Sequence, residues 1–286
     1  MRCDLHVHTV HSGLCNIPIM SAFCLESYSE PEAVYTKLKR QGMALVTITD
    51  HDSIGALEDL RSHPDFFVSE EVTCTLPGGS GMHVGVYDMN DRQHIEVQRR
   101  RDDFESLIAY LREQNLFFSA NHIFSSLTGK RTMADFEAFE SLFDAVEVLN
   151  GCMLEVTNRG ATAFAARCGK VALGGSDAHT LTTAGCCWTE VSGARSKTEF
   201  FAGLRQGRGS VHGNQGSYLK LTRDIVEIGL AMVTSNPFTA PVALLGGFVP
   251  IITLINYIRE RQFAYRWSSL LNKVDYRERS ICEVAA

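Results

Sequence analysis

The stretch that decides the fold is Asp4-Leu5-His6-Val7-His8-Thr9, close to the amino terminus. Its apolar and polar residues alternate, which predicts a short buried strand. Because side chains two positions apart lie on the same face of a strand, His6 and His8 share one side, with Asp4 behind them. Two imidazoles on one wall pack poorly in a core but suit zinc, iron or manganese. The stretch therefore predicts the start of a metal site that other segments must complete.

Length and charge limit the classes of protein to which the chain can belong. Its 286 residues can form one large α/β domain, or a smaller domain followed by an extension. A formal net charge of −6 with 21% charged residues gives no sign of a nucleic-acid-binding surface. Nine cysteines without a Cys-x-x-Cys pair favour a reducing compartment. No signal peptide is apparent, so we expect a cytoplasmic protein.

Apolar runs farther along the chain alternate with amphipathic ones, and most of the apolar runs reach a polar or metal-binding side chain. The expected strands are residues 43–49, 66–73, 82–87, 116–120, 145–149 and 171–173. The expected helices are residues 30–41, with Ser29 as N-cap, 92–114, 134–142 and 158–168. Residues 78–81, Gly-Gly-Ser-Gly, are expected to form a hairpin loop. Alternating strands and helices predict a parallel β/α barrel with its chemistry at the carboxyl ends of the strands.

Eight metal-binding side chains lie at or beside these strand ends. A single histidine in such a place is more often structural than a ligand, but independent structural histidines would not gather on one rim. All eight are nitrogen or oxygen donors, so a site without thiolates is sufficient. The candidate ligands are His6, His8, His51, Glu71, His83, His122, Asp177 and His179.

The motifs around these residues closely resemble the PHP family, named for polymerase and histidinol phosphatase. The resemblance covers residues 1–215 and implies an α/β fold, a distorted seven-stranded (β/α)7 TIM-like barrel, with two or three divalent ions such as zinc, manganese or iron. It also implies a phosphoesterase. The matching motifs are Asp4-Leu-His6-Val-His8-Thr9, Ile48-Thr-Asp50-His51-Asp52, Glu71-Val-Thr73, His83, Asn121-His122 and Gly175-Ser-Asp177-Ala-His179.

The resemblance also implies how the ligands are shared. His6, His8, Glu71 and Asp177 would hold one ion, and Glu71 would bridge to a second ion held by His83 and His122. A third ion would be held by His51 and His179. Family members generally add an Asp or His five or six residues after the second histidine of the first motif, and Gly13 and Leu14 stand at these positions. His11 and Cys15 are nearby donors that could substitute.

With ions bound, the expected reaction is hydrolysis of a small phosphate ester, a monoester or a diester, by a metal-bridging hydroxide. Glu71, Asp177, His51 and His179 are the candidate catalytic residues, and protonated His51 and His179, or a third ion, would assist the leaving alkoxide. The candidate substrate-binding residues are Lys130, Arg131 and Arg159, for which plain exposure to solvent is the alternative. Asp50 and Asp52 could orient ligand imidazoles, or be solvated loop carboxylates.

Two other functions stay open on the sequence alone. One is metal-dependent hydrolysis of a C–N bond; a lysine bridging the metals would favour it, whereas Glu71 takes that place. The other is a non-catalytic regulatory module, which loss of ligands would favour, and Gly13 marks the one such loss.

The carboxyl-terminal extension, residues 216–286, differs from the rest in composition. It contains no charged residue from Ile228 to Ile258, and basic residues stand on both sides. Pro237, Pro241, Pro250 and Gly246-Gly247 would break or kink a membrane helix, and a single crossing conflicts with the positive-inside tendency. We therefore expect either a hairpin lying on the inner face of a membrane, or an apolar segment buried against the barrel or a subunit partner.

Overall fold

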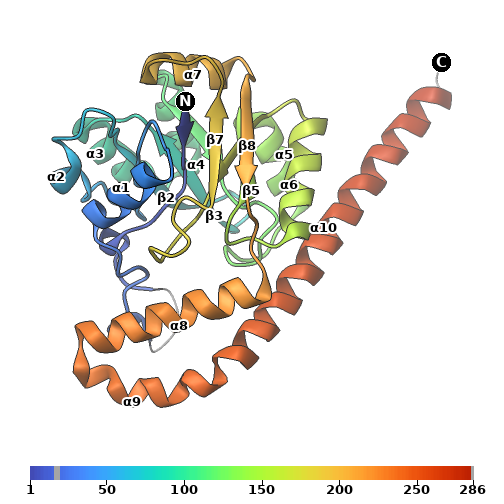
Figure 1. The fold of residues 1–286 in the computed structure, drawn as a ribbon. Coiled ribbons are helices and arrows are strands. Elements are labelled where there is room, and N and C mark those ends of the chain that lie inside the picture. Colours follow the sequence, from blue (N-terminus) through green and yellow to red (C-terminus); the bar gives the residue numbers. More distant parts are fainter. Residues whose placement is uncertain (16–19, 285–286) are drawn as a thin grey trace.

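The computed structural model describes residues 1–15 and 20–284, apart from the side chains of residues 243, 244 and 274–284. Figure 1 shows two sheets with helices around them and a helical extension. The strands are β1 (Arg2–Cys3), β2 (Ser69–Thr75), β3 (Gly81–Tyr87), β4 (Phe117–Ala120), β5 (Ala145–Asn150), β6 (Val171–Gly175), β7 (Cys187–Val191) and β8 (Gly209–Gly213). The helices are α1 (Pro31–Arg40), α2 (Leu57–Leu60), α3 (Asp91–Arg100), α4 (Phe104–Glu113), α5 (Met133–Leu142), α6 (Glu155–Arg167), α7 (Lys197–Arg205), α8 (Tyr218–Ser235), α9 (Ala240–Ala243) and α10 (Val249–Val284), with 3-10 turns η1 (Val10–Ser12), η2 (Met20–Ala22), η3 (Pro237–Thr239) and η4 (Leu244–Phe248).

The larger sheet is mixed, in the order β2-β3-β4-β5-β6. β3 runs antiparallel to both β2 and β4, whereas β4, β5 and β6 run parallel. The antiparallel pairing of β2 and β3 follows from the short connection through Gly78 and Gly79, because a parallel crossover needs a dozen residues or more. Gly79 has a φ of 83°, a conformation that favours glycine. The hairpin loop predicted here is therefore confirmed.

The predicted closed barrel is not seen among the described residues. β1, β7 and β8 form a separate antiparallel sheet. Two segments, residues 4–8 and 43–51, lie between the edges of the larger sheet but contribute only isolated parallel bridges, Val7 with Ala178, Val46 with Phe66 and His51 with Glu71. Their backbone groups bond partly to side chains, as when the Val7 amide donates to Thr49 Oγ1 at 2.9 Å. The fold is therefore mixed α/β with an open sheet.

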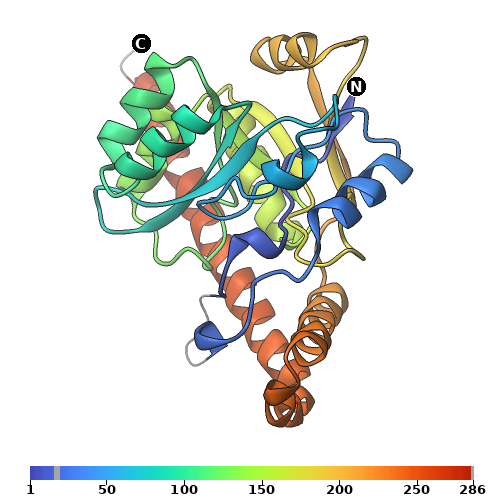
Figure 2. The same cartoon turned by 90° about the vertical axis from the view of Figure 1, so that its left-hand side faces the viewer.

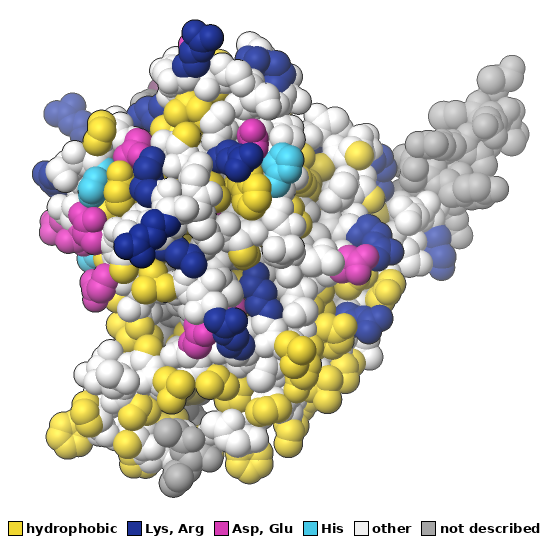
Figure 3. Space-filling view, viewed as in Figure 1, with side chains coloured by type: hydrophobic (Ala, Val, Ile, Leu, Met, Phe, Trp, Pro, Cys, Tyr) yellow, Lys and Arg dark blue, Asp and Glu magenta, His cyan; other side chains and the backbone are white. Residues whose placement is uncertain are grey.

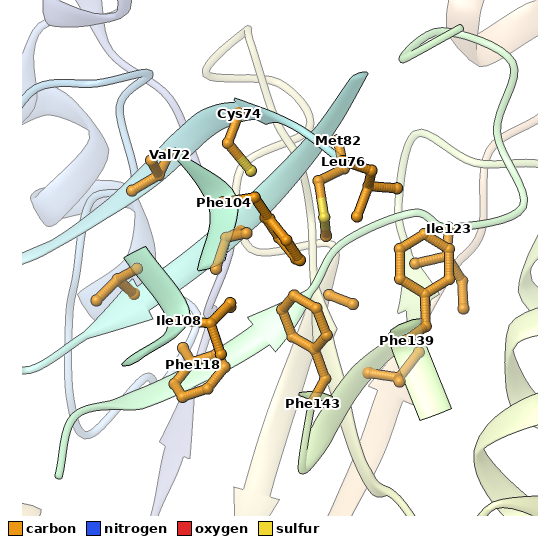
Figure 4. Close-up of a cluster of buried hydrophobic side chains, with 14 of the residues drawn as sticks. Val72, Cys74, Leu76, Met82, Phe104, Ile108, Phe118, Ile123, Phe139 and Phe143 are labelled. Carbon is orange, nitrogen blue, oxygen red and sulfur yellow. The ribbon is translucent and has the colours of Figure 1, made fainter. Parts of the chain in front are cut away.

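The main hydrophobic core lies between the larger sheet and helices α3 to α6. Figure 4 shows that Phe104, Phe118 and Phe143 point toward one another within it. Rings of Phe118 and Phe143 meet edge to face with centroids 5.5 Å apart, a favourable aromatic geometry. Trp267 of α10 joins the same core and is only 5% exposed. The middle of α10 is thus anchored on the body of the protein.

Several element boundaries differ from the sequence predictions. The single helix expected over residues 92–114 is two helices, α3 and α4, because Asp103 accepts a hydrogen bond from the Ser106 amide and caps a new helix. α1 is preceded by Glu30 rather than by the expected cap Ser29. Glu71 lies inside β2 instead of at its end.

The carboxyl-terminal extension forms a helical hairpin, with α8 and α10 as its arms. The arms are joined by hydrogen bonds, Thr222 Oγ1 to Thr253 Oγ1 at 2.8 Å and Tyr218 Oη to the Pro250 carbonyl at 3.0 Å. In Figure 2 the hairpin projects below the sheets, with its turn at the bottom. The segment around the turn is exposed rather than buried against the body, since Phe238 is 95% exposed. No helix within the described residues is both long and apolar enough to cross a bilayer.

Candidate metal centre

The histidines that follow β1 form the first wall of the site. The alternation predicted for this segment is confirmed, because Leu5 and Val7 are buried in hydrophobic clusters while His6 and His8 face the other way. The Nε2 atoms of the two imidazoles are 3.1 Å apart, and both residues are at most 1% exposed. Two ring nitrogens this close, on two buried imidazoles, are suited to bind the same metal ion.

Glu71 is the centre of the cluster. Its carboxylate lies within 3.5 Å of five imidazoles contributed by five separate positions of the chain. Oε2 is 3.1 Å from His6 Nε2, and Oε1 is 3.2 Å from His122 Nε2. The antiparallel register of β2 and β3 places Thr73 opposite His83, two residues from Glu71 on the same face. Because its two oxygens face different imidazoles, Glu71 can bridge two ions.

The segment after β6 supplies the last two predicted ligands. Asp177 Oδ1 is 3.3 Å from His8 Nε2, and the ring of His179 stacks on the ring of His8 with centroids 4.4 Å apart. All eight predicted ligands therefore lie in one cluster. They form four groups whose donor atoms lie within 4.8 Å of one another: His8, His51 and His179; His6, His8 and Asp177; His6, Glu71 and His122; His51, Glu71 and His83.

Unsatisfied ring nitrogens test whether this cluster suits metal ions. The Nδ1 atoms of His51, His83 and His122 are buried and have no hydrogen-bond partner. Buried polar atoms are nearly always paired, so such orphans need an explanation. An imidazole nitrogen left without a partner next to a buried carboxylate is the arrangement that a metal ion completes. The residues present thus fit divalent ions.

The backbone at two ligands supports the same view. His122 has a φ of 33° and Asp177 a φ of 51°, both in the left-handed region that residues other than glycine rarely adopt. Such conformations cost free energy and persist where the surrounding structure holds them, commonly at functional sites.

Charge within the cluster is balanced between carboxylates and imidazoles. Burial alone would raise the pKa of Glu71, but the neighbouring imidazoles, His6 first, hold that pKa well below its ordinary value. Burial would lower the pKa of His6, yet Asp177, Glu71 and Glu147 together raise it well above its ordinary value. Burial also lowers the pKa of His51 to about 3. The carboxylates therefore stay ionised, and His51 stays in the neutral form that binds metals.

Several residues behind the ligands fix the orientation of the imidazoles. Glu147 Oε1 is 2.7 Å from His6 Nδ1, and its Oε2 accepts from the His122 amide at 3.1 Å. Asp50 accepts from Ser12 Oγ at 2.7 Å, and Ser12 Oγ in turn lies 3.0 Å from His8 Nδ1. A carboxylate behind a ligand histidine sets which ring nitrogen faces the metal. This arrangement is consistent with the orienting role predicted for Asp50.

Asp52 lies elsewhere. Its carboxylate accepts from the Thr73 amide at 2.8 Å and pairs with Arg101 at 2.7 Å. It belongs to the surface of the β2 segment, with no contact to a ligand imidazole.

Sequence reasoning missed Glu26, whose carboxylate lies beside His51 and His179, the two residues predicted to hold a third ion. Its Oε2 is 3.5 Å from His51 Nε2, and its Oε1 is 3.7 Å from His179 Nε2. Burial opposes ionisation, but His179 and the other imidazoles lower the pKa of Glu26 to about 2. The sequence carried one signal that could have found it, because Glu26 is the single acidic residue between His8 and Glu30. The loop bearing it includes residues 16–19, which lie outside the described part of the chain.

The two substitutes considered from the sequence do not reach the cluster. His11 Nε2 lies 3.4 Å from Asp59 at the surface. Cys15 is buried in a small apolar cluster with Cys24 and Met232. Glu26 thus takes the place that neither residue fills.

The basic residues predicted to bind a phosphate differ in their surroundings. Arg131 is 5% exposed and donates to the carbonyls of Gly81 at 2.7 Å and Ile123 at 3.3 Å. These bonds tie the loop together, and the predicted contact of Arg131 with phosphate stays a prediction. Arg159 is exposed and pairs with Glu155 one helical turn away, and Lys130 is exposed. For Arg159 and Lys130 a role in substrate binding stays a prediction.

Comparison with known proteins finds a matching family model and several similar proteins. The PHP-associated family PHP_C matches residues 156–208, a segment that includes α6, β6 and the ligands Asp177 and His179. This match supports the resemblance to the PHP family. The chain is also 26% identical over 151 residues to the uncharacterized protein MJ1587 of Methanocaldococcus jannaschii, an alignment that covers 52% of this chain and 82% of the relative.

Two solved structures are similar to this chain. PsfC from Pseudomonas syringae PB-5123 has a TM-score of 0.55 at 17% identity, covering 82% of this chain and 98% of PsfC. The lesion-specific endonuclease PfuEndoQ from Pyrococcus furiosus has a TM-score of 0.49 at 17% identity, covering 74% of this chain and 58% of the endonuclease. The likeness to PsfC shows that the fold recurs in another protein.

Proposed function

We propose that this chain is a metal-dependent hydrolase that acts on small phosphate esters. The observation that carries the proposal is the position of Glu71 among five imidazoles, two of which, on His51 and His83, direct unpaired ring nitrogens to it. Two or three divalent ions, zinc, manganese or iron, suit this all nitrogen and oxygen donor set. When bound, such ions lower the pKa of a coordinated water and neutralise charge on phosphoryl oxygens.

The ligands divide around Glu71 as follows. His6, His8 and Asp177 surround one position beside Glu71 Oε2, and His122 faces Glu71 Oε1. His51 and His83 share a further group with Glu71. His8, His51 and His179 form the remaining group, to which we add Glu26.

The residues behind the ligands hold protons at defined atoms. His6 Nδ1 donates to Glu147, which leaves Nε2 with its lone pair directed into the site. His179 Nδ1 lies 3.0 Å from the Asp177 carbonyl and donates to it, so His179 Nε2 faces Glu26. Glu26 and Asp177 raise the pKa of His179 to about 9 against the effect of burial. His179 is thus the residue best placed to hand a proton to a departing alkoxide when no ion occupies its group.

The rival functions fit the site less well. A bridging carboxylate rather than a lysine stands at the centre, which favours phosphoester over C–N hydrolysis. All eight predicted ligands are brought together, which favours catalysis over a non-catalytic module.

Metal content and hydrolysis, measured on the same samples, test the proposal. Wild type is expected to carry two or three equivalents of metal and to hydrolyse p-nitrophenyl phosphate or bis-p-nitrophenyl phosphate, the two substrates separating monoesterase from diesterase. Glu71→Ala is expected to lose both properties, whereas Glu105→Gln, an exposed control on α4, keeps them. Bound metal with cleavage of amides alone would assign the C–N reaction, and wild type without bound metal would refute the proposal.

A further inference from the structure

The turn of the carboxyl-terminal hairpin carries a large exposed apolar surface, which we call the hairpin tip and define as residues 228–258. Exposed apolar side chains project from four of its elements, including Leu230 of α8 (63% exposed), Phe238 of η3 (95%), Phe248 of η4 (56%) and Ile251 of α10 (56%). Figure 3 shows hydrophobic side chains gathered over these lower helices. Because soluble proteins rarely expose contiguous apolar patches, such a surface indicates an interaction site.

The exposed residues of α10 occupy more than a narrow stripe. Ile251, Ile252, Leu254, Ile255 and Ile258 are between 45% and 56% exposed. At about 100° per residue these positions span roughly 160° of the helix circumference. Thr253 is fully buried and faces α8. The tip is therefore apolar over a broad, curved face and on both arms. Fluid lipid acyl chains can surround a surface of this shape.

Charge at the borders of the tip favours one occupant. The acidic side chains at its ends are already engaged: Asp224 and Glu260 are buried, and Glu227 pairs with Arg223 at 2.8 Å. From residue 259 to residue 273, where the side chains of α10 are described, the exposed charges are basic: Arg259, Arg261, Arg266 and Lys273. Arg261 lies over the rings of Tyr257 and Tyr265, at 5.6 Å and 5.8 Å from the centroids. The apolar residues suit the acyl-chain layer of a lipid surface, and the arginines and tyrosines that follow them suit its anionic headgroup layer.

The length of the apolar part sets the depth of any insertion. From Val249 to Ile258, α10 rises about 15 Å before Arg259, roughly half of the ~30 Å hydrocarbon core of a bilayer. This length fits entry into a single leaflet, in agreement with the finding that no described helix can cross.

We propose that the hairpin tip docks this protein on an anionic lipid bilayer. Its apolar side chains enter the outer part of one leaflet, and Arg259, Arg261 and Arg266 lie at the level of the headgroups. The fixed body remains in water, since Trp267 and Leu271 anchor α10 in the main core beyond the arginines. The proposal is independent of the reaction at the metal centre.

Flotation with lipid vesicles tests the docking. The full chain is mixed with vesicles of phosphatidylcholine alone or of phosphatidylcholine with phosphatidylglycerol, and the fraction that floats is measured. Wild type is expected to float with the mixed vesicles and more weakly with phosphatidylcholine. The double variant Phe238→Asp, Phe248→Asp should lose about tenfold or more in affinity, because each change places a charge in the apolar layer.

Matched variants separate the contributions of the apolar and the basic residues to vesicle binding. Ile95→Asp alters a residue of α3 that is 49% exposed and remote in the fold, and should float like wild type. Arg259→Gln, Arg261→Gln should weaken binding several-fold on the mixed vesicles and lose its difference from wild type at high salt. Circular dichroism and metal content, unchanged in all variants, show that folding is intact.

Two results would overturn the proposal. One is failure of wild type to float with either vesicle, or equal flotation of wild type and the double aspartate variant. The other is a wild-type dimer in sedimentation that the double aspartate variant dissociates while vesicle binding is absent, which would assign the tip to a second copy of the chain.

Discussion

Soluble proteins usually expose charged side chains and bury apolar ones. The metal centre departs from the first half of this rule and the hairpin tip from the second. The centre buries ionisable side chains, with Glu71 and His6 each 1% exposed. The tip exposes apolar ones, with Phe238 at 95%. Buried charge and exposed apolar surface both cost free energy unless something compensates them. By the two proposals made above, a component from outside the chain supplies this compensation, a cation in one case and an apolar phase in the other.

The two regions also touch. Met232 of α8 packs with Cys15 and Cys24, in the loop that continues to Glu26. Thr180, next to the ligand His179, donates to Asp224 of α8 at 3.4 Å. A change in one region can therefore reach the other through the loop of residues 20–26 or through α8. The following predictions ask whether the regions act independently.

The largest effect is expected from Glu71→Gln, which keeps the shape of the side chain but removes its charge. Loss of the bridging carboxylate should reduce phosphoester hydrolysis by about a thousandfold or more, because the stabilisation of charge at phosphorus depends on both ions. Vesicle binding should stay at the wild-type level. A parallel loss of vesicle binding, measured by flotation, would show that the two regions are not independent.

Removal of metal tests how much bound metal contributes to the free energy of unfolding of the protein. Ligand bound at a hundred times its dissociation constant adds about 2.7 kcal/mol to the free energy of unfolding. Chelation is therefore expected to lower the melting temperature measured by calorimetry, and restored metal to return it. The double variant Phe238→Asp, Phe248→Asp should respond by the same amount, whereas a smaller response would contradict the separation of the regions.

Glu26→Gln tests the loop that lies between the regions. We expect loss of about one equivalent of metal, because a carboxylate donor to the group of His51 and His179 is removed while the ligands around Glu71 remain. Metal analysis of the purified variant measures this directly. His11→Gln, in the same loop but paired with Asp59, serves as control. Full metal content in Glu26→Gln would exclude Glu26 as a ligand.

The smallest effect is expected from His94→Gln, a substitution beside the buried charged region. It should change the pH dependence of the free energy of unfolding. Its hydrogen bond to Glu70 raises the pKa of His94, with Nδ1 to Oε2 at 2.9 Å. A raised folded-state pKa means that the pair stabilises fully below the unfolded pKa near 6.5 and is lost as pH rises through the folded value.

Denaturation at several pH values checks this expectation. His94→Gln should flatten the pH dependence of the free energy of unfolding at pH values above about 6.5, by less than about 1 kcal/mol because the pair is partly solvated. Metal content should not change. A loss of metal in His94→Gln would extend the centre beyond the predicted ligands.

Local sequence patterns predicted many of the strands and helices correctly. They did not predict that the larger sheet stays open instead of closing into a barrel. The strands β3, β4, β5 and β6 and the helices α1, α5 and α6 occur within a few residues of their predicted places, because alternation and capping act over neighbouring residues. The open sheet depends on which strands meet, which the short turn after β2 and the irregular segment of residues 43–51 decide. The division of the chain at residue 215 stays a prediction.

From the sequence alone, residue type and spacing predicted the eight side chains that gather at the centre and the uncharged segment at the tip. Only the tertiary structure decided the contributions of Glu26 and Glu147. Glu147 meets His6 across 141 residues, and Glu26 enters through a loop without periodicity. Only tertiary structure, too, buried Arg131 among carbonyls and left Phe238 in the open. Long-range contacts are set by packing of the whole chain, which local patterns of sequence do not encode.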